Sequence, residues 1–223
     1  MRIVRRSVTL PLTALLLLTG CGNLLGGGKR DTLLRFGMIG PVSAPSHAMP
    51  TQRHALSLGR ISVPPEAEGD RILTTRGETM LYLKDARWVA SVPELLAQAL
   101  DRQFRNRAPH IALVPARSSG RLAPRLRIDL DSFEARYAPG VGQDPPVVQM
   151  RGEVILAAGC EDAETIAKQF AVRVPATANS KSAIAAGFDR GVSEFTRQIV
   201  DWVSINLNGG QGLKCERLPL AQS

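Results

Sequence analysis

The chain of 223 residues is long enough for one sizeable hydrophobic core, and its formal net charge is +8. Three of its basic residues lie within the first six positions, so the rest of the chain is only mildly basic. This balance indicates ordinary solubility more than attraction to anionic lipid surfaces. The sequence has no arginine-rich helix, zinc-ligand spacing or aromatic RNA-binding motif, which argues against nucleic-acid binding.

Residues 1–20 have the pattern of a bacterial signal peptide. Arginines precede an apolar run of eleven residues, Val8–Leu18, which is shorter than the about 20 residues needed to cross a bilayer. The run ends in Leu18-Thr19-Gly20-Cys21, which resembles the lipobox of bacterial lipoproteins. In such signals the cysteine is acylated, because its thiolate is the most nucleophilic side chain near neutral pH. We therefore predict acylation at Cys21; a plain signal peptide with an incidental cysteine is the alternative.

The residues after this cysteine predict the destination of the protein. An aspartate directly after the acylated cysteine resembles an inner-membrane retention signal, and this chain has Gly22 instead. The sequence therefore predicts an anchor in the outer membrane, with the protein facing the periplasm. Residues 21–32 form the lipidated N-terminus and a flexible tether, in which three glycines are followed by charged residues.

Short strands are predicted in the first half of the domain. Residues 33–39 form the first, and residues 55–63 form the second, with a phase slip near Gly59. Two further runs, 71–75 and 79–83, are joined by a hairpin signal.

A helix follows these strands. Ser91 and Glu94 have the spacing of a capping box, and Pro93 is tolerated in the first helical turn. The helix has an apolar stripe of Val92, Leu95, Leu96, Ala99, Leu100 and Phe104. Residues 111–114 form another strand.

The second half predicts an antiparallel meander and a closing helix. Apolar and polar residues alternate over 125–137, and the alternation shifts phase after Ser132, which indicates a β-bulge. Two more strands follow over 148–156 and 166–174. Asn179 or Ser180 caps a long helix that continues to residue 206 and stops at a glycine pair. The predicted fold is one α/β domain over 33–207: a mixed sheet with a long antiparallel meander and two amphipathic helices packed on it. Residues 208–223 form a tail.

The remaining two cysteines are an even pair in an oxidising compartment. Cys160 lies in a turn-like segment, and Cys215 lies in the C-terminal tail. We predict a disulfide between them, with two free thiols as the alternative.

No motif for catalysis, nucleotides or metals is present. The histidines at 47, 54 and 110 are interpreted as solvated, the first two in a loop, and neither a metal site nor a cofactor is predicted. Asp129 and Asp131 share one strand face, which favours a solvated surface over a catalytic pair. Gly187 and Gly191 favour close packing of the last helix on the sheet. The residues alone therefore favour a binding or structural role over an enzyme.

The segment Leu56–Leu100 carries the most distinctive pattern in the chain. A strand ending in Val63-Pro64 is followed by an Asp-Arg-Ile triplet, a further arginine, a tyrosine, a tryptophan and a proline-led amphipathic helix. The motif positions are Pro64, Asp70, Arg71, Arg76, Tyr82, Trp88 and Pro93. With the lipobox, this ordered set resembles the ABC-type transport auxiliary lipoprotein component family, which includes the PqiC-like proteins. The first strand departs from that family, because Leu34-Arg35-Phe36-Gly37 stands where a Tyr-x-Leu strand is common.

The resemblance implies a non-catalytic subunit of an envelope lipid transporter. The protein would sit at the outer membrane and dock an Mce-domain protein of the ABC transport system, with phospholipid as a further ligand and a homo-oligomeric ring as a possible assembly. Trp88 then has two interpretations, a docking anchor or a core residue, and we favour the core. Two other classes remain open: a lipoprotein that activates a cell-wall synthase or assists outer-membrane assembly, and a lipid-anchored hydrolase.

Overall fold

The computed structural model describes residues 31–38, 53–119, 123–140, 144–159 and 165–208. Cys21, Cys160, Cys215 and His47 lie outside these residues, so the predicted acylation and disulfide stay predictions. The chain divides into two compact units, 1–31 and 32–223, and the fold described below belongs to the second. All residues of the hydrophobic core lie within this second unit, between Phe36 and Val203.

The sheet is mixed and has eight strands among the described residues. Its largest part is the predicted meander, in which β6 (Arg125–Tyr137), β7 (Val147–Ala157) and β8 (Thr165–Pro175) pair antiparallel. The predicted bulge is confirmed, because the register of β6 on β7 shifts between Leu130 and Ser132.

Two strands share the other edge of β6, and both run parallel to it. The first half of β6 pairs with β2 (His54–Ser62), and its last residues pair with β3 (Arg71–Arg76). Between these two strands the chain forms a short 3₁₀ helix, η1 (Pro65–Ala67). The middle of β6 therefore has no strand partner on this edge, and η1 lies beside that gap.

The remaining strands extend the sheet. β4 (Thr79–Trp88) forms the predicted hairpin with β3 and then pairs with β1 (Thr32–Leu34), which is shorter than predicted. β5 (Ile111–Pro115) pairs parallel with β2 and leads into a second 3₁₀ helix, η2 (Ala116–Ser118). β4 is longer than predicted because it continues through Asp85, whose φ of 52° turns the chain. The ammonium group of Lys181 donates a 3.0 Å hydrogen bond to the Asp85 carbonyl at this turn.

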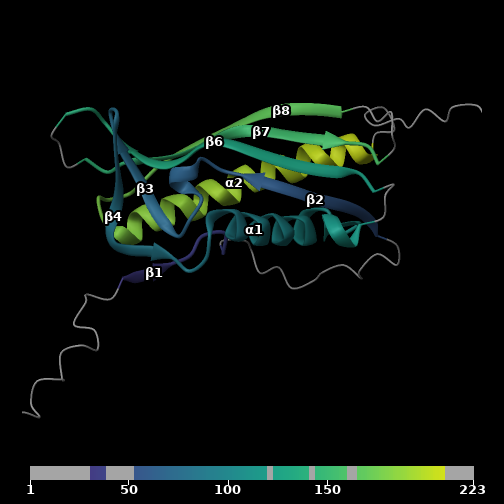
Figure 1. Ribbon diagram of the computed structural model, residues 1–223, viewed down its shortest axis with the longest axis horizontal. Coiled ribbons are helices and arrows are strands. Elements are labelled where there is room, and N and C mark those ends of the chain that lie inside the picture. Colours follow the sequence, from purple (N-terminus) through teal and green to yellow (C-terminus); the bar gives the residue numbers. More distant parts are fainter. Residues whose placement is uncertain (1–30, 39–52, 120–122, 141–143, 160–164, 209–223) are drawn as a thin grey trace, which may run out of the picture. The chain divides into compact units, whose positions relative to one another are not determined.

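The two helices lie on one face of the meander, as Figure 1 shows. α1 (Val92–Arg107) packs against α2 (Lys181–Asn208) and against β2 and β5, whereas α2 packs on β7 and β8. Every residue of the predicted α1 stripe is buried. Together with the sheet, this arrangement confirms the predicted fold class.

The helix caps differ in part from the prediction. The Ser91 hydroxyl donates to the Glu94 carboxylate at 3.2 Å, and no side chain caps a backbone N–H of α1, so the capping box is incomplete. At α2 the cap is Ser180, whose hydroxyl accepts the Ala183 N–H at 3.3 Å. Asn179 instead accepts a hydrogen bond from the Tyr137 hydroxyl.

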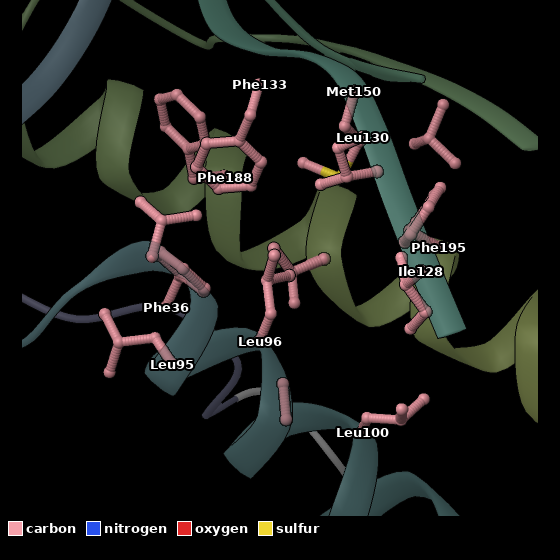
Figure 2. Close-up of a cluster of buried hydrophobic side chains, with 14 of the residues drawn as sticks. Phe36, Leu95, Leu96, Leu100, Ile128, Leu130, Phe133, Met150, Phe188 and Phe195 are labelled. Atoms are coloured by element: carbon pink, nitrogen blue, oxygen red, sulfur yellow. The ribbon is translucent and has the colours of Figure 1, made fainter. Parts of the chain in front are cut away.

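Aromatic rings link the helices to the sheet. Trp88 is only 2% exposed and packs edge-on against Phe36 and Phe188, with centroid distances of 4.8 and 5.1 Å. Phe133 completes this group, and Figure 2 shows it against Phe188. The core interpretation of Trp88 is therefore confirmed.

Two glycines of α2 allow its close approach to the sheet. A Cβ atom at Gly187 would lie 2.9 Å from a Val148 methyl, and one at Gly191 would lie 3.0 Å from the Met150 methyl. Val148 and Met150 both belong to β7. The predicted helix-on-sheet packing is thus confirmed.

Gly152 on β7 faces the bulge of β6 and carries a prediction of its own. A Cβ at this position would lie 2.3 Å from the Asp129 carbonyl oxygen and 2.6 Å from the Leu130 Cα, both backbone atoms. We expect Gly152→Ala to lower the free energy of unfolding by about 3 kcal/mol, because the two strands must move apart. Urea denaturation measures this loss. Gly69→Ala is the control, since a Cβ there meets nothing within 4 Å; equal stability of the two variants would contradict the prediction.

Candidate functional site

The motif residues converge on the β3–β4 hairpin and η1. The Tyr82 hydroxyl of β4 donates a 3.1 Å hydrogen bond to the Glu66 carbonyl of η1. On β3, the Arg71 guanidinium lies 3.8 Å from the centroid of the Tyr82 ring, close enough for a cation–π interaction. Tyr82 therefore ties η1 to the hairpin through its hydroxyl and holds Arg71 through its ring.

Other motif residues join the ends of β3 and β4 or lie at the start of η1 and α1. The Asp70 carboxylate pairs with Arg87 at 3.2 Å, and the Asp70 carbonyl accepts the Trp88 N–H at 2.7 Å. Pro64 precedes η1, and Pro93 occupies the first turn of α1, where it lacks only an N–H that would have no helical partner. These residues fix the backbone at the ends of the hairpin and at the starts of η1 and α1.

Arg76 lies at the tip of the hairpin with Tyr137 of β6. Its guanidinium is 5.0 Å from the Tyr137 ring centroid and donates to the Gly140 carbonyl at 2.5 Å. Burial raises the pKa of the Tyr137 hydroxyl above its ordinary value, and the positive charge of Arg76 opposes that shift.

A polar pocket of about 150 Å³ lies beside this cluster. It is on the face of β6 and β7 opposite the helices, because its polar lining residues Ser132, Glu134 and Arg136 alternate along β6 with core positions; the core residue Phe133 also lines it. Pro64, Glu66 and Met80 line one side. Side chains of β6 and β7 line the other side, among them Ser132, Glu134, Arg136, Gln149 and Arg151.

Glu134 is the most unusual residue of the pocket, because it is a carboxylate that is only 5% exposed. One carboxylate oxygen accepts hydrogen bonds from Arg136 Nε at 3.0 Å and Nη2 at 2.7 Å. The Ser132 hydroxyl donates to the same oxygen at 3.5 Å and accepts from Gln149 at 3.4 Å. The desolvation cost of burying this charge is offset by the ion pair and its hydrogen bonds.

Glu134 was not singled out by the sequence. The phase shift after Ser132 places it on the outward face, where exposure is the normal expectation. It is buried because η1 and the hairpin fold over this part of β6, and that cover comes from residues about 60 positions away.

The other sequence candidates do not form a reactive cluster. Asp129 pairs with Arg127 at 2.8 Å, and Asp131 pairs with Arg151 at 3.2 Å, so the solvated strand face is confirmed. His54 lies on β2 and not in a loop. Its backbone N–H donates to the His110 carbonyl at 2.8 Å, and its side chain is exposed. Within the described residues, no group of three or more His, Cys, Asp or Glu side chains is arranged to hold a metal ion.

Apolar side chains are exposed on the same hairpin. Met80 and Leu81 are 57% and 62% exposed, and Met80 also lines the polar pocket. Leu33 and Val89 are exposed where β1 meets the end of β4. Among the helices in the described part of the chain, none is long and apolar enough to cross a membrane.

Tyr82 offers a direct test of the framework. We expect Tyr82→Phe to lower the free energy of unfolding by about 1 kcal/mol, because the Glu66 carbonyl loses its hydrogen bond while the ring stays over Arg71. Tyr82→Leu should cost a further ~0.5–1 kcal/mol, since the cation–π contact is also lost. Chemical denaturation of the three proteins measures both steps. Wild-type stability for both variants would show that Tyr82 does not hold η1.

The fold and the motif cluster together define the class of the protein: a single α/β domain whose mixed sheet carries two helices on one face. Crystal structures with this fold include the following two. Protein XCC0632 from Xanthomonas campestris, of the DUF330 family, is 21% identical, with 78% of this chain and 95% of that chain covered at a TM-score of 0.62. An uncharacterized protein is 13% identical, with 78% and 99% covered at a TM-score of 0.60. Comparison with the curated proteins gives no significant match.

The chain belongs to the ABC-type transport auxiliary lipoprotein component family, whose sequence model matches residues 38–200. This match confirms the resemblance drawn from the segment Leu56–Leu100. Membership makes the protein an auxiliary component associated with ABC-type transport.

Proposed function

We propose that the protein is a lipoprotein anchored in the outer membrane that serves as a non-catalytic auxiliary subunit of an Mce/ABC-type envelope lipid transport system. The family match over residues 38–200 carries this proposal. The Leu18–Cys21 lipobox and Gly22 support the anchor and its location on the periplasmic side. The Mce-domain protein of the same system is the proposed partner.

The polar pocket supports binding over catalysis. Its buried carboxylate, Glu134, already accepts two hydrogen bonds from Arg136, and the two other acidic side chains of this strand face are also paired with arginines. These ion pairs hold the carboxylates in place, which favours a structural role for them.

The β3–β4 hairpin is the proposed docking surface. Met80 and Leu81 are exposed at its tip, and large exposed apolar side chains near arginines are typical of interface contacts. The contacts of Tyr82, Arg71 and Asp70 brace the two strands of this hairpin and hold it against η1, so its apolar tip is presented on a fixed support. A ring of copies would let each subunit make the same contact with a ring-shaped partner.

The test is binding of the purified chain from Lys29 onward to the Mce-domain protein encoded nearby, without ATP. We expect a complex at micromolar concentrations, and we expect Met80→Ser combined with Leu81→Ser to weaken it at least tenfold. Ile205→Ser is the matched control, because Ile205 is 71% exposed near the end of α2 and away from the hairpin.

No complex at tens of micromolar with a chain folded by circular dichroism would contradict the transporter proposal and favour activation of a cell-wall synthase or a role in outer-membrane assembly. A complex that the Ile205 control weakens as much as the double variant would contradict the hairpin as its docking surface.

A further inference from the structure

A second and larger cavity lies on the helix side of the sheet. It is an open groove of about 700 Å³ between α1, β2 and the end of β5, within the roughly 300–1,000 Å³ range of ligand sites. Leu58 of β2, Ala97 of α1 and Leu113, Val114 and Pro115 of β5 give it an apolar lining. It is separate from the hairpin and from the polar pocket, with which it shares no lining residue.

Local irregularities in the chain create this space. The register of β2 on β6 shifts between Leu58 and Ile61, and Gly59 at the shift contributes no side chain. On the facing helix, the position toward the groove is Ala97, whereas its neighbours Leu95 and Leu96 point into the core. A bulge and a small side chain therefore leave a hollow where a packed layer would otherwise continue.

The rim of the groove is positively charged. Asp101 is neutralised by Arg105 at 2.7 Å, and the Gln98 amide accepts a hydrogen bond from Arg35. Arg60 and Arg117 also line the rim, and no ion pair between either arginine and a described carboxylate is formed. The Ser119 hydroxyl contacts the Ser57 hydroxyl at 2.9 Å and donates to the Ala116 carbonyl at 2.8 Å, which fixes the η2 turn that carries Arg117.

We propose that this groove binds one acyl chain of an anionic glycerophospholipid, whose phosphate lies against Arg60 and Arg117. The groove is apolar, and the two arginines at its mouth pair with no carboxylate in the described part of the chain, so it matches the acyl chain and the phosphate of such a molecule. The inference rests on the proposed function and extends it, because it makes the auxiliary subunit a carrier of lipid and not only a docking point.

A bound peptide strand fits the groove less well. β5 is the neighbouring edge strand, but it has only five residues and ends in Pro115, which has no N–H to offer an added strand. Backbone pairing gives such complexes much of their affinity, and this short edge provides little of it.

The experiment measures calorimetric binding of lysophosphatidylglycerols with acyl chains of 10, 12 and 14 carbons, each below its micelle concentration, to the chain from Lys29 onward. This chain is suitable because the whole core lies within residues 32–223. We expect one saturable site whose affinity rises about fourfold for each added methylene.

Variants separate the two halves of the proposed site. Ala97→Phe should fill the groove and weaken binding at least tenfold, whereas Ala167→Phe on the exposed face of β8 should leave it unchanged. Arg60→Gln with Arg117→Gln should weaken lysophosphatidylglycerol binding about tenfold and leave binding of an uncharged monoacylglycerol of the same chain length, which lacks the phosphate, nearly unchanged. Lys168→Gln with Arg173→Gln removes the same charge from β8 and should have no effect.

Three outcomes would overturn the proposal. The first is that the folded wild-type chain shows no saturable lipid binding. The second is that the affinity does not depend on acyl-chain length. The third is that the Ala97→Phe variant binds lipid normally but no longer binds the Mce-domain protein. The last would make the groove a protein-docking site. Lipid binding is measured without the partner, so a chain that forms the Mce complex but binds no lipid contradicts this inference alone, and a chain that forms no complex contradicts the proposed function.

Discussion

Replacing Leu96 by aspartate is expected to unfold the domain. Leu96 is 3% exposed in the second turn of α1, and Figure 2 shows it pointing into the cluster that also contains Phe188 and Leu130. Truncating such a leucine costs about 2–5 kcal/mol, and an unpaired buried carboxylate adds to that cost. A total loss of ~4 kcal/mol or more is comparable to the whole stability of many domains.

Thermal and urea denaturation followed by circular dichroism measure the effect, with Gln98→Asp as the matched control. Gln98 is exposed two residues further along the same helix, so the new charge there stays in water and should cost no more than ~1 kcal/mol. A Leu96→Asp protein that is soluble, folded and only defective in binding would show that the apolar stripe of α1 faces a partner and not the core.

Local periodicity was sufficient to predict most elements. The α1 stripe repeats every 3.6 residues and the three meander strands alternate every 2 residues, each over nine or more positions, so their buried faces can be assigned from the chain alone. Even the bulge in β6 was visible, because inserting one residue reverses the alternation after Ser132.

The unpredicted parts depend on contacts between distant residues. Nothing in β2 or β3 indicates that both run parallel to the same edge of β6, because parallel pairing leaves no turn signature between the partners. The extension of β4 to Trp88 has no sequence signal for a different reason. Asp85 interrupts the alternation in a left-handed conformation, and its support comes from Lys181 at the start of α2.

The same distinction applies to the sites. The motif residues 64–93 are close in sequence and could be identified by their order, but the contact between Tyr82 and η1 could not. The buried Glu134 and the groove beside Ala97 each depend on what covers, or fails to cover, an outward-facing position. A sequence pattern gives the direction of a side chain, whereas burial is a property of the assembled layers.

Replacing Cys21 by serine is expected to abolish membrane anchoring. The proposed acylation uses the thiol sulfur, and a serine hydroxyl is a far weaker nucleophile at neutral pH. The Leu18–Gly20 segment stays intact in this variant, so export itself should be unaffected. We expect an unlipidated precursor that incorporates no labelled palmitate and does not fractionate with the outer membrane.

The matched control for this experiment is Gly22→Asp. It keeps the acylated cysteine but introduces the residue that resembles an inner-membrane retention signal, so the protein should still be labelled and should move to the inner-membrane fraction. The two variants separate the anchor from its destination, because one removes the lipid and the other redirects it. Unchanged palmitate labelling of the Cys21→Ser variant would contradict the lipobox interpretation, since acyl chains on another residue would then hold the protein to the membrane.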